Sequence, residues 1–242
     1  MCYNISITPS LADIERVFGA RFTQPESYQS VYSASAFSYP FMPVISSENP
    51  QVIEFYQWGL IPFWVKDIEA AKKIRQRTLN ARSETIFEKP SFRHSIMTKR
   101  CLVIADGFFE WRHENKKAYP YYIKLKNNKP FTIAGIWDSW KNRDTNEELR
   151  TFSIITTIAN SLVEKIHNTR KRMPVILPAD KEKEWLDENL TKEQIAAFLK
   201  SFDAGEMDAY TVSNIVNKQG HNTANPEVLA EHEYPDLSRL LI

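Results

Sequence analysis

Short apolar runs of strand length recur along this chain and constrain its fold more than any other feature. Residues 100–105 form a continuous apolar run that stops at Asp106-Gly107, a pair typical of a turn. Residues 151–157 have the same character and predict a second buried strand. Runs of this length suit strands, so the sequence predicts a fold built largely from β-sheet.

Further strands are expected on both sides of these runs. Residues 3–8 alternate in polarity, and residues 52–58 are rich in β-type side chains. Residues 121–125 and 131–137 predict a β-hairpin whose turn is formed by the polar residues 126–129.

Helical segments are fewer. Ser10 can cap the start of one helix, with Asp13 at its third position. A second segment has acidic residues near its start and basic residues near its end, which matches the sign of the helix dipole. The predicted helices cover residues 11–18, 67–79, 159–166, 181–189 and 192–202, and residues 210–216 predict a last strand before a polar loop over 217–225.

Many strands with a few scattered helices predict an α+β fold with a mostly antiparallel, barrel-like β core and peripheral helices. The chain has 242 residues, of which 43% are hydrophobic and 25% are charged. This length and composition suit a globular protein with one large core, so we expect a single domain over residues 2–242.

Several classes of protein are excluded by the sequence. No apolar run approaches the roughly 18 to 20 residues that cross a bilayer, and no signal peptide is evident, so we expect a cytoplasmic protein without membrane contact. Cys2 and Cys101 are too few for a disulfide scaffold and lack zinc-ligand spacing, so we expect no metal and no cofactor. The formal net charge is +1, so any nucleic-acid surface must be a local patch.

Cys2 directly follows Met1 and becomes the N-terminal residue when that methionine is removed. It then carries a thiol and a free α-amine on one short frame. Their unperturbed pKa values are about 8.5 and about 7.7 to 8.0, so both groups have a reactive fraction near physiological pH. The alternative is that Cys2 is an ordinary small residue near the start of the chain.

Two titratable residues lie in unusual settings. Glu110 sits among three aromatic residues in the stretch 106–111, where a buried carboxyl would have a raised pKa and could transfer a proton or hold an amine. His167 precedes the basic residues 170–172, whose charges would lower the imidazole pKa and leave it able to act as a base. The alternatives are a Glu110 that points outward from its strand and a solvated surface histidine.

Four residues are candidates for contact with nucleic acid. Asn80 and Arg82 fall at alternate positions, so an extended segment places both on one face, where an amide and a guanidinium can hold a phosphate. Trp58 and Trp64 offer aromatic faces, and base stacking on such faces is worth about 1 to 3 kcal/mol per base in single-strand binders. Core packing is the alternative explanation for each tryptophan.

The order of these motifs is more specific than any one of them, and it closely resembles the SRAP family, the SOS response-associated peptidases. The resemblance extends from residue 2 to about residue 178. It rests on Cys2, residues 58–64 (WGLIPFW), residues 80–85 (NARSET), residues 106–111 (DGFFEW), residues 134–137 (AGIW) and His167 ahead of Arg172-Met173-Pro174.

The resemblance implies a single α+β domain with a positively charged groove for single-stranded DNA. Family members lose Met1 by autocatalysis and use Cys2 to form a covalent crosslink with abasic sites, as part of the response to DNA damage. The product expected from an N-terminal cysteine and an aldehyde is a thiazolidine. We expect this chain to act on single-stranded DNA that contains abasic sites, and to do so as a monomer.

Residue roles follow from the same resemblance. Asn80 and Arg82 are expected to hold the DNA backbone near the lesion, Glu110 to serve the amine of Cys2, and His167 to handle protons at the sugar. A general acid or base of this kind contributes about 10² to 10⁴ in rate.

Two departures from the family pattern concern the site. Many members continue Cys2 with Gly-Arg, whereas Tyr3-Asn4 follows here, and residues 168–171 lengthen the spacing from His167 to the Arg-Met-Pro motif. Two other functions stay open as alternatives: a thiol peptidase that acts on other proteins, and a non-covalent binder of single-stranded DNA.

Overall fold

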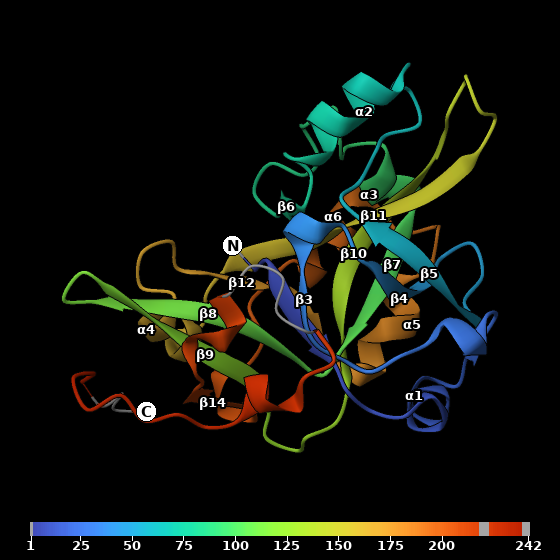
Figure 1. Ribbon diagram of the computed structural model, residues 1–242. Helices are drawn as coiled ribbons and strands as arrows, with labels where there is room; N and C mark the ends of the chain where they lie inside the picture. Colours follow the sequence, from blue (N-terminus) through green and yellow to red (C-terminus); the bar gives the residue numbers. More distant parts are fainter. Residues whose placement is uncertain (1, 218–222, 239–242) are drawn as a thin grey trace.

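The computed structural model describes residues 2–217 and 223–238 (Figure 1). These residues form fourteen β-strands and six α-helices, joined by turns and short 3-10 helices. The strands make up two sheets, and the helices lie around them.

Five strands of the larger sheet close into a barrel. β11 (Glu148–Ile158), β10 (Phe131–Lys141), β7 (Arg100–Ala105), β4 (Phe41–Ser46) and β5 (Val52–Trp58) are antiparallel neighbours in this order. β5 then pairs with β11 in parallel, which closes the ring. Closure removes the unpaired edges that an open sheet would have. The predicted α+β class with a mostly antiparallel, barrel-like core is confirmed.

Four short strands extend the barrel. β2 (Arg21–Phe22) pairs with β5, and β13 (Ile176–Leu177) pairs with β10. β6 (Asn80–Arg82) and β12 (Arg172–Pro174) both pair with the end of β11, β6 in parallel and β12 antiparallel. Two segments that are distant in sequence are thereby brought to the same place on the barrel.

The second sheet is antiparallel and contains the start of the chain. Its strand order is β14 (Met207–Thr211), β9 (Lys117–Leu125), β8 (Gly107–Glu114), β1 (Asn4–Ile7) and β3 (Val31–Ser35). β1 is therefore an inner strand, with β8 on one side and β3 on the other. In Figure 1 the N label lies between β6 and β12, which extend the barrel, and the second sheet with β8.

Local sequence signals explain the ends of several helices. Ser10 accepts a hydrogen bond from the Asp13 N–H at 3.2 Å, and Gly19 ends the same helix with a left-handed φ of 63°. The α-helices are α1 (Leu11–Phe18), α2 (Ile68–Arg75), α3 (Ser95–Thr98), α4 (Ser161–Ile166), α5 (Glu182–Trp185) and α6 (Lys192–Phe198). The 3-10 helices are Pro25–Ser27, Ala36–Ser38, Ala179–Lys181, Ala204–Glu206, Asn214–Asn217 and Pro226–Leu229.

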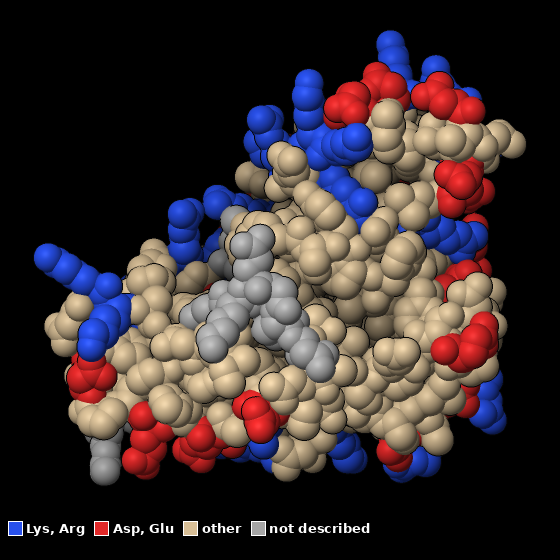
Figure 2. Space-filling model, in the orientation of Figure 1, with Lys and Arg blue, Asp and Glu red and all other residues tan. Residues whose placement is uncertain are grey.

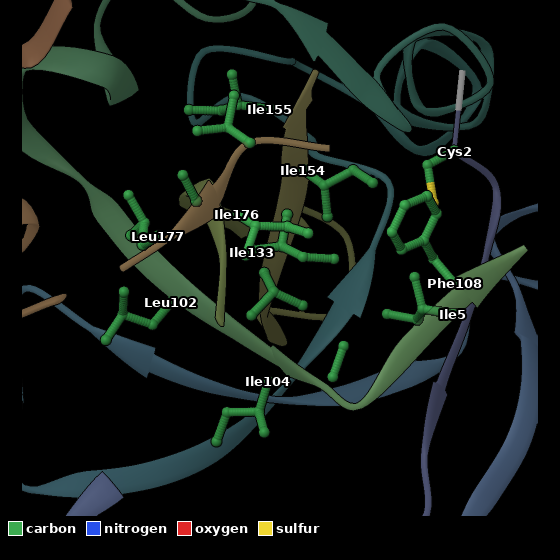
Figure 3. Close-up of a cluster of buried hydrophobic side chains, with 14 of the residues drawn as sticks. Cys2, Ile5, Leu102, Ile104, Phe108, Ile133, Ile154, Ile155, Ile176 and Leu177 are labelled. Atoms are coloured by element: carbon green, nitrogen blue, oxygen red, sulfur yellow. The ribbon is translucent and has the colours of Figure 1, made fainter. Parts of the chain in front are cut away.

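The main core fills the barrel and continues to the first residues of the chain. Figure 3 shows aliphatic side chains of the barrel strands, among them Ile133 and Ile154, packed together. Cys2 belongs to the same buried cluster and lies beside Phe108 and Ile5. The start of the chain is thus part of the core rather than a loose end.

The predicted hairpin between residues 121–125 and 131–137 is wrong. β9 pairs with β8 and β14, whereas β10 pairs with strands of the barrel. The actual hairpin joins β8 to β9 through Asn115 and Lys116, whose φ values of 49° and 63° suit a two-residue turn.

Other boundaries also differ from the predictions. The helix expected over 67–79 ends at Arg75, because the chain must extend again to form β6. The helices expected over 181–189 and 192–202 are shortened to α5 and α6. The strand expected over 210–216 is wrong in its second half, where the ladder with β9 ends at Thr211. Part of the polar loop expected over 217–225 lies outside the described residues.

Within the described residues, no helix is long and apolar enough to cross a membrane. Over the same residues, no three His, Cys, Asp or Glu side chains gather in a way that could hold a metal ion.

The position of β1 depends on Asp106, the residue between β7 and β8. Its carboxylate accepts hydrogen bonds from the Ser6 hydroxyl at 2.5 Å, from the Thr8 N–H at 3.0 Å and from the Thr8 hydroxyl. The Asp106 N–H in turn donates to the Ser6 carbonyl at 3.0 Å. These contacts tie the end of β1 to the start of β8 and so fix the first residues of the chain.

Replacing Asp106 with alanine should therefore destabilise the protein by about 2 kcal/mol or more, because hydrogen bonds to a charged group are worth about 1.5 to 3 kcal/mol each. Urea unfolding of wild type and variant measures the difference. Asp208→Ala is the matched control, because Asp208 is an exposed aspartate on β14. Equal stability of the Asp106 and Asp208 variants would contradict the role given to Asp106.

Candidate active site

Cys2 lies immediately before β1 and is fully buried. Burial raises the pKa of its thiol well above the ordinary value, and the nearby charge of Glu110 raises it further. The sulfur also lies 3.6 Å from the Asn4 carbonyl, to which it can donate. In this state the thiol is protonated near neutral pH, and it is shielded from solvent.

Glu110 lies in the middle of β8 with only 3% of its surface exposed. The alternative that it points outward to solvent is therefore wrong. Burial raises the pKa of its carboxyl to about 8. Glu110 can thus carry a proton near neutral pH and still release it without a large change of environment.

His167 ends α4 and is also buried, so the alternative of a solvated surface histidine is wrong. Its Nδ1 lies 2.9 Å from the Arg172 carbonyl and 3.3 Å from Oε2 of Glu110. A carbonyl oxygen can only accept, so Nδ1 carries the hydrogen and Nε2 is the ring nitrogen with the lone pair. Burial lowers the pKa of the imidazole to about 4.

The contact between Glu110 and His167 has the geometry of an ion pair, but burial moves the two pKa values in opposite senses. A carboxyl with a pKa of about 8 and an imidazole with a pKa of about 4 are both uncharged at pH 7. We therefore describe the pair as a carboxylic acid beside a neutral imidazole. Because Nδ1 already donates to the Arg172 carbonyl, Oε2 of Glu110 can only share that hydrogen, and the lone pair of the imidazole on Nε2 lies outside this contact.

Arg172 fixes the carbonyl that orients His167. Its guanidinium forms two bonds with the Glu84 carboxylate, at 2.6 and 3.0 Å, and a third with the Thr156 carbonyl of β11 at 2.7 Å. This role of Arg172 was not predicted from the sequence, where the residue stands only as part of the Arg-Met-Pro motif. The acid at position 84, inside the motif of residues 80–85, is the sequence signal that could have indicated this role.

Asn80 and Arg82 lie together on β6, as their alternation predicted. Asn80 is 8% exposed, and neither its amide oxygen nor its amide nitrogen has a hydrogen-bond partner among the described residues. Arg82 is exposed and forms no ion pair within residues 2–217 and 223–238. A buried amide without partners costs stability, so this one is a strong candidate for a ligand contact.

The two tryptophans differ. Trp58 is fully buried, and its ring stacks on Phe152 with centroids 5.7 Å apart. Its Nε1 donates to the Leu79 carbonyl at 2.8 Å, directly before β6. The expected stacking of a base on Trp58 is therefore contradicted, and the residue instead supports the strand of Asn80. Trp64 is 44% exposed and keeps a face available.

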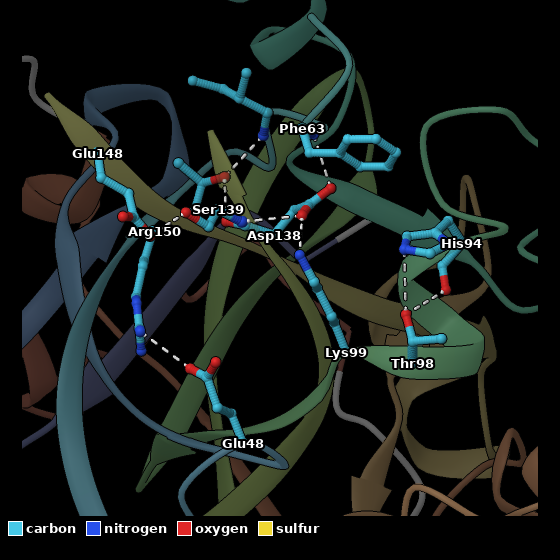
Figure 4. A network of polar contacts seen from close by, with 11 residues as sticks. Glu48, Phe63, His94, Thr98, Lys99, Asp138, Ser139, Glu148 and Arg150 are labelled. Atoms are coloured by element: carbon cyan, nitrogen blue, oxygen red, sulfur yellow. Dashed lines mark hydrogen bonds and ion pairs between the residues drawn. The ribbon is translucent and has the colours of Figure 1, made fainter. Parts of the chain in front are cut away.

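Asp138 binds the backbone of the loop that carries Trp64. Figure 4 shows the buried Asp138 carboxylate between the Phe63 backbone and the Lys99 ammonium. The Phe63 N–H donates to it at 2.9 Å and Lys99 at 2.6 Å. Phe63 itself is 53% exposed, so the loop presents two aromatic side chains on a fixed backbone.

Positive charge gathers near the start of the chain. In Figure 2, Lys and Arg side chains predominate along the hollowed edge that runs from α2 toward α4 and the β8 end of the second sheet. Acidic side chains are more frequent along the lower and right-hand margins of the same view. A surface of this kind attracts a polyanion although the net charge of the chain is only +1.

A cavity of about 730 Å³ lies elsewhere. Its lining includes Leu177 of β13 and Phe198 of α6, together with charged residues such as Lys181 and Glu184. None of the residues of the candidate site lines this cavity.

Comparison with known proteins identifies similar sequences over nearly the whole chain. The family model described as SOS response associated peptidase (SRAP) matches residues 1–219. The abasic site processing protein YoqW of Bacillus subtilis is 37% identical over 235 residues, which cover 96% of this chain and 100% of the relative. The abasic site processing protein HMCES of Xenopus tropicalis is 33% identical over 207 residues, which cover 76% of this chain and 59% of the relative.

A solved structure has the same fold. The crystal structure of a protein from Bacteroides thetaiotaomicron superimposes with a TM-score of 0.90 at 42% sequence identity, covering 96% of this chain and 100% of that one.

The raised pKa of Glu110 predicts a specific dependence of stability on pH. Between pH 4.5 and about 8 the folded state holds a proton that the unfolded state has released, so the contribution of Glu110 to stability falls as the pH rises. Glu110→Gln should match wild type near pH 4.5, gain stability relative to it up to pH 8 and then level off. One pKa unit corresponds to about 1.4 kcal/mol.

Urea unfolding of both proteins at several pH values measures this difference. The low-pH points serve as the internal control, because the carboxyl is then neutral in both states. A difference that stays flat from about pH 5 to pH 9 would show that Glu110 is ionised in the folded protein throughout.

Proposed function

This chain belongs to the SOS response associated peptidase (SRAP) family, and we propose that it binds single-stranded DNA and traps abasic sites covalently through Cys2. The observation that carries the proposal is the contact of Glu110 with His167 beside the buried start of the chain. Relatives named as abasic site processing proteins support the class of substrate. The protein would thereby shield the lesion during the response to DNA damage.

Cys2 acquires its reactive form when the bond to Met1 is hydrolysed, a self-processing step that consumes one water and releases the α-amine. The amine attacks the aldehyde of a ring-opened abasic sugar, and loss of water gives an imine. The thiol sulfur then bonds to the imine carbon while its proton passes to nitrogen. The product is a five-membered thiazolidine, which requires the amine and the thiol of one N-terminal residue.

Glu110 suits the attack of the Cys2 amine on the aldehyde. Its pKa of about 8 is close to the value of about 7.7 to 8.0 for a free α-amine, so a proton can move between the two groups with little change in free energy. The positive charge of an ammonium at Cys2 would itself favour the carboxylate form of Glu110. Glu110 therefore takes the proton of the ammonium and leaves the amine able to attack.

His167 suits the opening of the sugar. Its Nδ1 is occupied by the Arg172 carbonyl, so Nε2 is the atom that can take up and pass on a proton. With a pKa of about 4, the protonated imidazole is a strong acid and gives its proton readily to the ring oxygen of the sugar. The aldehyde that Cys2 needs is formed in this step.

Asn80, Arg82 and Trp64 supply the contacts that hold the strand. The amide of Asn80 and the guanidinium of Arg82 project from one short strand and can hold backbone oxygens near the lesion. The exposed face of Trp64 can stack on a neighbouring base. A single strand presents the abasic sugar without the unpairing that a duplex would require, which favours single-stranded DNA as substrate.

Intact-mass spectrometry tests the proposal. Protein that has lost Met1, mixed with a single-stranded oligonucleotide bearing one abasic site, should give one species with the summed mass minus one water. Cys2→Ala and protein that retains Met1 should give no stable adduct. Normal binding by wild type without any adduct would refute covalent trapping and leave the non-covalent binder. Catalytic cleavage of an added polypeptide would instead favour the thiol peptidase.

The reaction and the binding should respond to different residues. Glu110→Gln and His167→Ala should each slow adduct formation at saturating DNA by about 10² to 10⁴, the range of a lost general acid or base, with little change in affinity. Arg82→Gln should do the reverse and weaken binding while the rate at saturation stays near that of wild type. Stopped reactions analysed on denaturing gels, together with a binding titration, separate the two effects. Equal rates for wild type and Glu110→Gln would exclude Glu110 from the chemistry.

A further inference from the structure

The loop between α4 and β12, residues 168–171, is held in place by hydrogen bonds. The side chain of Asn168 accepts a hydrogen bond from the His113 N–H at 3.0 Å and donates one to the His113 carbonyl at 2.8 Å. These are the two bonds that a neighbouring strand would make with His113, which lies near the end of β8. Asn168 thus attaches the loop to the same strand that carries Glu110.

The other end of the loop is equally defined. Lys171 has a left-handed φ of 51°, and its N–H donates to the His167 carbonyl at 2.7 Å. The Lys171 ammonium forms an ion pair with Glu164 of α4 at 2.8 Å. The loop is therefore closed by backbone and side-chain contacts at both ends, with Thr169 and Arg170 between them.

Arg170 is exposed and forms no ion pair with any residue of 2–217 and 223–238. Its backbone lies in the turn that the Lys171 N–H closes on the carbonyl of His167, the residue that contacts Glu110. Burial raises the pKa of Tyr3, and the positive charges of Arg170 and Arg82 oppose that rise. Burial likewise lowers the pKa of His167, and the charge of Arg170 adds to that effect. These effects agree with a place for Arg170 in the turn after His167, on the side of the molecule that holds the start of the chain.

The like charges of Arg82 and Arg170 indicate the kind of ligand that this arrangement favours. Two unpaired arginines near one point repel each other, and their repulsion is relieved when an anion lies between or beside them. Arg170 has no acidic partner among the described residues, so its donors are available to an oxygen anion. A guanidinium binds phosphate through two parallel hydrogen bonds.

We propose that Arg170 binds a backbone phosphate next to the abasic sugar, and that Asn168 is the positioning residue that holds Arg170 there. The inference rests on the proposed function and adds a second phosphate contact to that of Arg82. In this arrangement β6 holds the strand from one segment and the loop after α4 holds it from another. The sugar between these contacts is then placed at Cys2.

The test measures binding without crosslinking. The ligand is a single-stranded oligonucleotide with a tetrahydrofuran abasic analogue, which has no aldehyde. For single strands, each lost phosphate contact reduces the slope of log affinity against log salt by about 0.7. The affinity deficit of Arg170→Gln should therefore shrink about fivefold over a tenfold rise in salt. Lys129→Gln removes an exposed charge in the loop between β9 and β10 and should change neither affinity nor slope.

A second measurement locates the contact. One linkage at a time on either side of the analogue is made a neutral methylphosphonate. At one linkage wild type should lose affinity while Arg170→Gln loses none, and Asn168→Ala should show a reduced loss at that same linkage. If every neutral linkage weakens Arg170→Gln as much as wild type, Arg170 touches no phosphate. If Asn168→Ala behaves as wild type, the positioning role is wrong.

The outcome is separable from that of the proposed function. A failure of covalent trapping would appear in wild type as a missing adduct with an aldehydic abasic site. If Arg170 does not contact a phosphate, each neutral linkage reduces the affinity of Arg170→Gln as much as that of wild type, while wild type still forms the adduct.

Discussion

The rest of the structure depends on the capture of the first residues of the chain as an inner strand. β1 forms hydrogen bonds with β8 on one side and β3 on the other, and Asp106 ties its end to the start of β8. Chain termini are commonly poorly ordered unless they are held in this way. Because two ladders would have to break before β1 could leave, Cys2 keeps a fixed place near Glu110.

Burial of that place determines the protonation of its side chains. The same exclusion of water raises the pKa of Glu110, lowers that of His167 and keeps the thiol of Cys2 protonated. A polar pair without charge is less costly to bury than an ion pair, and it still contains a proton and a lone pair for exchange. The closed barrel behind the site supplies the rigidity that allows these groups to stay desolvated.

Sequence predicted the parts of the fold that local signals determine. The run at 100–105 and the helix at 11–18 have the predicted bounds, because a turn pair ends the first and Ser10 with Gly19 delimits the second. Closure of the barrel could not be predicted, since it depends on the parallel pairing of β5 with β11, which are about ninety residues apart. The wrong hairpin has the same origin: residues 126–129 suit a turn, but the two-residue turn at Asn115 and Lys116 had already given β9 its partner.

The candidate site could also be predicted only in part. The order of motifs predicted which residues gather, but their exposure is decided by packing, which places Trp58 under β6 and leaves Trp64 at the surface. The surroundings of Tyr3 likewise come from segments far along the chain, since the charges of Arg82 and Arg170 oppose the rise that burial causes in its pKa. In the proposed site, the buried groups Glu110 and His167 depend on packing between strands and α4, whereas the exposed positive charges of Arg82 and Arg170 depend only on where a short strand and a loop end.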